Sequence, residues 1–138
     1  THAFKGELPN YNGVFIARVS LLDRKGSCIS VNDYIIDGSG LGNYTTLNDL
    51  PNVTLKLECC RRGEDVIYRI SNPEKTIAVG VKLSLEDATS GQQVLPAIFS
   101  DGYFNLYPGE SREISVKHFH SKPVRLFAEG YNVNSIVK

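Results

Sequence analysis

The sequence has 138 residues, of which 41% are hydrophobic and 22% are charged, with fifteen basic and fifteen acidic side chains. This size and composition predict one folded domain, and the zero formal net charge argues against nucleic-acid binding. No apolar run approaches the roughly 20 residues that cross a bilayer, and the absence of methionine, even at position 1, indicates an excised or processed fragment.

The first half of the chain predicts two strands followed by a long connection. Residues 1–13 are expected to be a lead-in, followed by one domain of residues 14–138. Apolar runs at residues 14–22 and 28–36, separated by Lys25-Gly26, predict strands on either side of a turn. The glycine-rich stretch 37–52 predicts a crossover connection with one helical turn.

The second half shows the clearest alternation of apolar and polar residues. Residues 53–58 and 66–70 predict a hairpin around the turn 62–65, and residues 79–86 predict a strand with one buried and one wet face. Further strands are expected at residues 94–99, 112–119 and 124–131. Pro108-Gly109 predicts a type II turn leading into the second of these. About eight strands at this spacing predict an immunoglobulin-like antiparallel β-sandwich of seven to nine strands.

The cysteines predict no metal or redox site. Three cysteines cannot all pair with one another, and their spacing fits neither a zinc site nor a C-x-x-C motif. We therefore expect structural thiols with at most one disulfide. Strand alternation predicts that Cys59 points inward and Cys60 outward, while Cys28 lies in an earlier strand.

No catalytic residue is predicted. Glu110 and Glu113 are the nearest approach to the two carboxylates of a glycoside hydrolase, but they flank a turn and fit a solvated strand entrance better. His118 and His120 have a spacing that suits a metal, yet no third ligand lies nearby. The stretch 38–42 misses the spacing of phosphate-binding loops and is interpreted as a flexible connection. No cofactor or metal is expected.

Two surface features leave alternatives open. Asn43 and Asn52 begin N-glycosylation tripeptides, which occur often by chance. Tyr103, Phe104 and Tyr107 could form a platform for stacking sugars, although packing around the Pro108-Gly109 turn explains the cluster equally well. The sequence has no tryptophan, the residue most expected on a carbohydrate-binding face.

Three segments, taken together, resemble a known family. They are residues 43–51 (NYTTLNDLP), 95–101 (LPAIFSD) and 103–111 (YFNLYPGES). In this order they are similar to the C-terminal immunoglobulin-like domain of glycoside hydrolase family 2 enzymes of the exo-β-glucosaminidase and β-mannosidase type. The resemblance extends over roughly residues 14–131.

The resemblance implies a non-catalytic accessory domain. The parent enzyme would hydrolyse β-linked mannosides or glucosaminides with two glutamates in a separate (β/α)8 barrel. This module would pack against the other domains, with an oligosaccharide at the cleft rim as a further partner, in a secreted or periplasmic protein. A stand-alone carbohydrate-binding module and a cell-surface immunoglobulin-like domain that binds protein are the alternatives.

Overall fold

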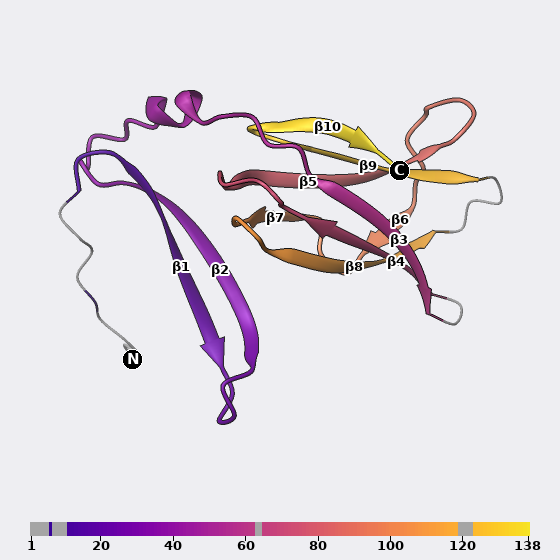
Figure 1. Cartoon of the computed structure of the whole chain (residues 1–138), viewed down its shortest axis with the longest axis horizontal. Helices are drawn as coiled ribbons and strands as arrows, with labels where there is room; N and C mark the ends of the chain where they lie inside the picture. Colours follow the sequence, from indigo (N-terminus) through magenta and orange to yellow (C-terminus); the bar gives the residue numbers. More distant parts are fainter. Residues whose placement is uncertain (1–5, 7–10, 63–64, 119–122) are drawn as a thin grey trace. The chain divides into compact units, whose positions relative to one another are not determined.

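The chain forms an all-β structure of two compact units. The computed structural model describes residue 6 and residues 11–62, 65–118 and 123–138, which contain ten strands and one 3-10 turn (Figure 1). Residues 1–50 form the first unit and residues 51–138 the second. No helix among the described residues is long and apolar enough to cross a membrane. The all-β prediction is confirmed.

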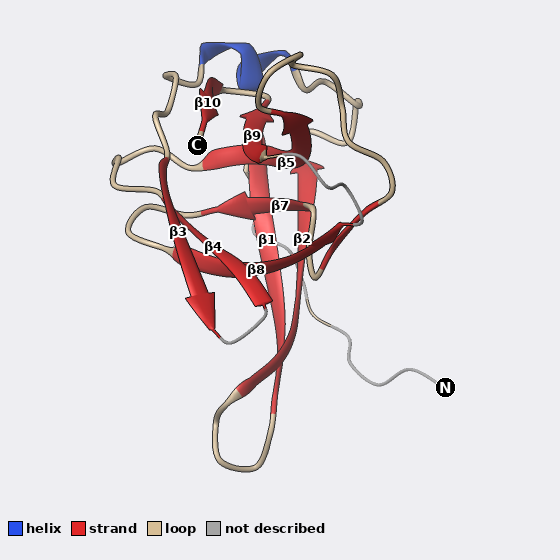
Figure 2. Ribbon diagram, turned by 90° about the vertical axis from the view of Figure 1, so that its right-hand side faces the viewer, coloured by secondary structure: helices blue, strands red, loops and turns tan. Residues whose placement is uncertain are grey.

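The first unit is built on one long hairpin. Strand β1 (Val14–Leu22) pairs antiparallel with β2 (Cys28–Asp37), as the ribbon in Figure 2 shows. Asp23 closes the turn between them because its carboxylate accepts the N–H groups of Lys25 and Ser27, each at 2.8 Å. The connection that follows contains η1 (Thr45–Asp49), the single helical turn expected there.

The two predicted strands exist, but their sheet differs from the expectation. β1 and β2 form a two-stranded sheet of their own and add no strand to the sandwich. The predicted division into a lead-in of residues 1–13 and one domain of residues 14–138 stays a prediction, because most of the lead-in lies outside the described residues. The two compact units divide at residue 50.

The second unit is a sandwich of two four-stranded antiparallel sheets. The first sheet has the order β10-β9-β5-β7, with strands at Val133–Val137, Val124–Gly130, Ala78–Asp87 and Tyr103–Leu106. The second has the order β3-β4-β8-β6, with strands at Lys56–Arg62, Asp65–Ser71, Ser111–His118 and Ala97–Phe99. Its eight strands agree with the predicted seven to nine.

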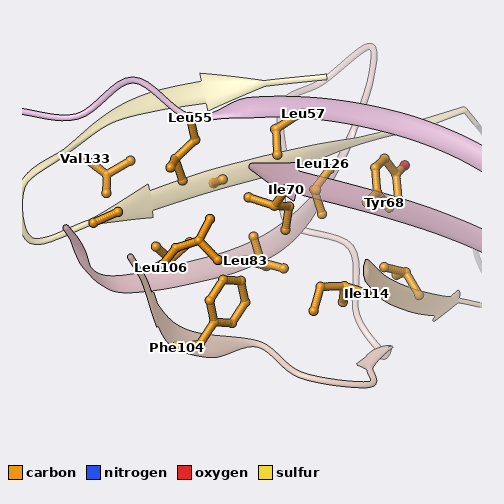
Figure 3. Packing of buried hydrophobic residues seen from close by; sticks show 14 of the residues in the cluster. Leu55, Leu57, Tyr68, Ile70, Leu83, Phe104, Leu106, Ile114, Leu126 and Val133 are labelled. Atoms are coloured by element: carbon orange, nitrogen blue, oxygen red, sulfur yellow. The ribbon is translucent and has the colours of Figure 1, made fainter. Parts of the chain in front are cut away.

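The core lies between these sheets, and β5 provides its most regular face. Val81, Leu83 and Leu85 alternate with more exposed residues and are at most 6% exposed. In Figure 3 the labelled side chains from both sheets point toward one another. Full burial of each such side chain contributes about 1.5–3 kcal/mol to folding. The fully buried large aliphatic members are Leu55, Ile70, Leu85, Leu106, Ile114, Leu126, Val53 and Val81.

The turn at Pro108-Gly109 is formed as predicted. Gly109 has a φ of 76°, which favours glycine, and the N–H of Glu110 donates to the carbonyl of Tyr107 at 3.0 Å. The Glu110 carboxylate accepts the N–H of Tyr107 at 2.9 Å. The N–H of Gly109 also donates to the carbonyl of Asn72 at 2.9 Å, which ties the turn to the end of β4.

Two buried asparagines connect segments distant in sequence. The amide of Asn72 donates to the carbonyls of Thr76 and Leu106 at 2.8 and 2.9 Å. Asn132 is 4% exposed. Its amide donates to the carbonyls of Pro51 and Ile77 at 3.0 and 2.9 Å and accepts the N–H of Val79 at 2.9 Å. These side chains satisfy backbone groups that no strand ladder reaches.

The last residue of the chain is part of the β10–β9 pairing. The N–H of Lys138 donates to the carbonyl of Leu126 at 2.9 Å, and the N–H of Leu126 donates to the carbonyl of Lys138 at 2.8 Å. The first sheet therefore remains hydrogen-bonded up to residue 138.

Candidate functional site

The two glutamates singled out from the sequence have different surroundings. Glu110 lies at the turn, where its carboxylate holds the N–H of Tyr107. Glu113 is an exposed residue within β8, opposite Arg69 of β4 in the strand register. The turn explains the position of Glu110, as the sequence analysis expected.

The glycine-rich loop is organised around a carboxylate of the chain itself. Asp37, at the end of β2, accepts the N–H groups of Ser39, Leu41 and Asn43 at 3.0, 3.1 and 2.9 Å. The Ser39 hydroxyl donates to its two oxygens at 2.8 and 2.7 Å. This hydroxyl is the largest cause, ahead of the backbone N–H groups, of the lowered pKa of Asp37, from 3.8 to about 2.

The loop is therefore not a phosphate cradle. Three of its N–H groups already face the Asp37 carboxylate, so they are not directed at an external anion. Residues 38–42 were interpreted from the sequence as a flexible connection. They do connect two segments, and hydrogen bonds to Asp37 hold their conformation.

The histidine pair can be followed only in part. His118 ends β8, where it lies opposite Ala97 of β6, and it is half-buried. His120 lies outside the described residues. Among the residues that the structure does describe, no group of three His, Cys, Asp or Glu side chains is arranged to hold a metal ion.

The aromatic cluster is divided between surface and core. Tyr103 is 73% exposed, whereas Phe104 is 6% exposed and belongs to the core. Tyr107 is half-buried beside the turn. Since β7 turns successive side chains to opposite faces, Tyr103 and Phe104 cannot form one stacking platform.

Phe104 takes part in an arrangement that the sequence analysis missed. The guanidinium of Arg112 lies 4.6 Å from the centroid of the Phe104 ring, and the same guanidinium forms an ion pair with Asp101. A cation over an aromatic face in partly covered surroundings stabilises the fold by about 1 kcal/mol. This arrangement connects β8 of the second sheet to β7 of the first.

The cysteine prediction was partly wrong. Cys28, Cys59 and Cys60 are all exposed, and none is in a disulfide. Cys59 shares the strand parity of the buried Leu57 and lies opposite Tyr68. It is nevertheless exposed, and β3 is an edge strand with a neighbouring strand on one side only.

Exposed apolar side chains lie along two edge strands of the sandwich. Leu95, Ile98 and Tyr103 are 74%, 58% and 73% exposed. Ile98 lies in β6 and Tyr103 in β7, the edges of different sheets. Since Ala97, Phe99 and Phe104 face the core, Ile98 and Tyr103 point outward from opposite sheets. Large apolar side chains at an edge are typical of a contact surface.

Comparison with known proteins identifies the domain. Residues 34–133, which are most of the chain, match the family model of the exo-β-D-glucosaminidase Ig-fold domain. The chain belongs to this family. The predicted resemblance to glycoside hydrolase family 2 enzymes of the exo-β-glucosaminidase type is therefore confirmed.

Individual proteins are also similar to this chain. An exo-β-D-glucosaminidase of Arthroderma benhamiae is 34% identical over 64 residues, which are 46% of this chain and 7% of that protein. The crystal structure of the exo-chitosanase CsxA of Amycolatopsis orientalis superposes with a TM-score of 0.73 at 18% identity. The superposed region is 91% of this chain and 18% of the CsxA chain.

A CsxA structure from an inhibition study with a glucosamine-configured castanospermine has a TM-score of 0.75, also at 18% identity, and covers 96% of this chain. At this identity the likeness shows the shared fold. The chain spans less than a fifth of the length of each of these relatives. None of them is named as a β-mannosidase.

Proposed function

We propose that this chain is a non-catalytic accessory domain of a larger family 2 glycoside hydrolase that removes β-linked glucosamine units by hydrolysing O-glycosidic bonds. The match of residues 34–133 to the exo-β-D-glucosaminidase Ig-fold domain carries this proposal. The catalytic glutamates would lie in another part of the polypeptide, and this domain would pack against or support the part that contains them.

The chemistry of the described residues supports a structural role. Asp37 is held by its own loop, Glu110 by the Pro108-Gly109 turn, and Asp101 by Arg112. Glu86 forms an ion pair with Arg125 at 3.1 Å. Carboxylates engaged in this way stabilise the fold, and they are poorly placed to act on a sugar as an acid and a nucleophile.

The edge strands supply a surface for neighbouring domains. Leu95 and Ile98 would lose water-exposed apolar area on contact with another domain, which is favourable by about 25 cal/mol for each Å² buried. The outer side of β6 is therefore the surface at which we expect a neighbour.

The test compares the purified 138-residue chain with the full-length enzyme on a nitrophenyl β-D-glucosaminide. We expect turnover by the full-length protein and none by the isolated chain. A full-length Leu95→Asp/Ile98→Asp variant should lose thermal stability, while Lys75→Asp, at an exposed loop position, should not. Turnover by the isolated chain would refute the proposal.

Carbohydrate binding is a second candidate because Tyr103 is a strongly exposed aromatic residue on an edge strand. Calorimetry with chitosan oligomers tests it on the isolated chain. Heat of binding that disappears in Tyr103→Ala would favour a carbohydrate-binding module, while the absence of heat would leave the accessory role. A secreted or periplasmic location of the parent enzyme remains a prediction, which an export signal in the full-length gene would support.

A further inference from the structure

Among the described strands, the hairpin β1–β2 has a neighbour on neither of its outer edges. The N–H of Gly38 donates to the carbonyl of Gly13 at 2.9 Å, which fixes the phase of the hydrogen bonding. Following the register from this pair, alternate β1 residues direct their backbone N–H and C=O groups away from β2. They are Val14, Ile16, Arg18 and Ser20. Within the described part of the chain, neither β1 nor β2 has another strand beside it.

One face of the hairpin is largely apolar and exposed, with Ser30 and Asn32 as its polar residues. The register places Phe15, Val19 and Leu21 of β1 on the same face as Tyr34 and Ile36 of β2. Val19, Leu21 and Tyr34 are 58%, 59% and 53% exposed. A two-stranded hairpin is marginally stable in water, and this apolar face lacks a covering layer among the residues described for its unit.

The opposite face holds a well-formed ion pair within apolar surroundings. Arg18 donates to the two carboxylate oxygens of Asp33 at 2.7 and 3.0 Å. Their side chains are only 22% and 10% exposed. Ile16 and Ile35, which are paired in the register, lie on the same face. This face of β1 therefore combines apolar residues with Arg18 and Ser20, and its ion pair is largely covered.

The family boundary separates the hairpin from the sandwich. The Ig-fold match begins at residue 34, so it leaves out all of β1 and most of β2. The compact units divide at residue 50. The CsxA superposition nevertheless covers 96% of this chain, which corresponds to 18% of the CsxA chain. The hairpin thus accompanies the Ig-fold domain without belonging to either of its sheets.

We propose that β1–β2 is the edge of a second β-sheet, completed by an antiparallel strand from another domain of the same polypeptide that pairs with the outer edge of β1. The same domain covers the face formed by Phe15, Val19, Leu21 and Tyr34. The added strand pairs with β1 because β2 carries Asn32 and Asp33, polar residues that suit an outer strand. This inference rests on the proposed membership in a larger enzyme.

Hydrogen exchange resolved to single amides tests the pairing directly. The full-length enzyme is compared with the 138-residue chain. Pairing predicts that the outward amides of Ile16, Arg18 and Ser20 exchange about 100-fold more slowly in the full-length enzyme. Equal rates in the two proteins would overturn the inference.

A variant tests the covering of the face. Val19→Asp in the full-length enzyme is expected to lower the first thermal transition by at least about 3 °C, because a carboxylate would enter an apolar contact. Lys75→Asp is the control, since Lys75 is an exposed loop residue of the other unit. Equal midpoints for the two variants would contradict the covering. If Val19→Asp does not fold, the exchange rates of the unmodified protein still decide.

Sedimentation and activity measurements identify the partner of β1 and show whether the pairing or the proposed function is wrong. If the 138-residue chain sediments as a dimer whose β1 amides are protected, the partner is a second copy and the inference is wrong. Glucosaminidase activity with unprotected β1 amides refutes only the pairing. Protected β1 amides in a full-length protein without that activity refute the proposed function and support the pairing.

Discussion

Replacing Asn132 by alanine should destabilise the sandwich strongly. The substitution removes three hydrogen bonds that the side chain makes to the backbone at Pro51, Ile77 and Val79. The Val79 N–H is buried and would lose its partner at a cost of about 1–3 kcal/mol, while the two partly buried carbonyls would cost less because water can reach them. We expect a loss of about 2–4 kcal/mol in the free energy of unfolding.

Urea unfolding followed by far-UV circular dichroism measures this change, since the chain has no tryptophan to report by fluorescence. Asn134→Ala is the control, because the Asn134 side chain is exposed and its amide donates to the Thr54 hydroxyl at 2.9 Å. The control should lose less than about 1 kcal/mol. Equal losses in the two variants, or a loss below about 1 kcal/mol for Asn132→Ala, would refute the reasoning.

Three further predictions concern separate parts of the chain. Gly130→Ala should destabilise the fold by about 1–3 kcal/mol in thermal denaturation, because the added Cβ would lie 2.7 Å from a methyl group of Val133. Gly102→Ala is the control and should be almost neutral, since the nearest contact of its Cβ would be 3.7 Å away. Protonation of Asp37 should open its loop. Since its pKa is lowered from 3.8 to about 2, the stabilisation is present above pH 4 and is lost as the pH falls through about 2. The protection factor of the Ser39 amide, which corrects for the intrinsic exchange rate at each pH, should therefore fall there, and Asp37→Asn should remove this pH dependence. All three cysteines should react with a thiol reagent in the native protein, and protection of Cys59 would contradict its exposed position.

The regular part of the sandwich could be predicted from local patterns. β5 was predicted because its odd-numbered residues from Val79 to Leu85 are apolar and their neighbours are small or polar, and the observed strand is only one residue longer at each end. The Pro108-Gly109 turn was also predicted, as was the pairing of β3 with β4. β3 nevertheless runs from Lys56 to Arg62 and not over the expected residues 53–58, and residues 63–64 of the expected turn lie outside the described residues. In each case the preference of the local sequence agrees with the environment that the fold provides.

Short and polar edge strands escaped prediction. β10 contains Asn134 and Ser135, so its sequence shows little alternation, and it forms because β9 offers a free edge. β7 has only four residues within a stretch interpreted as an aromatic cluster. β10 is paired only by β9, the strand directly before it, whereas β7 depends on β5, which lies earlier in the chain beyond β6. Local patterns do not reveal either pairing.

Sheet membership and edge exposure were harder still. The apolar runs of β1 and β2 have the same pattern as sandwich strands, so their separate sheet could not be inferred. Cys59 has the parity of a buried residue, but parity gives only the direction of a side chain and not how far the core extends along the strand. The role of Asn132 had no local signal, because its hydrogen-bonding partners come from two other segments.

The pairing of Lys138 with Leu126 has a practical consequence for anyone who extends or trims this protein. Shortening the chain by a single residue would delete both hydrogen bonds and begin to fray the first sheet from its outer strand. A purification tag fused directly after Lys138 would start while the polypeptide is still hydrogen-bonded to β9. A flexible spacer should therefore come first, or the tag should be placed at the other terminus.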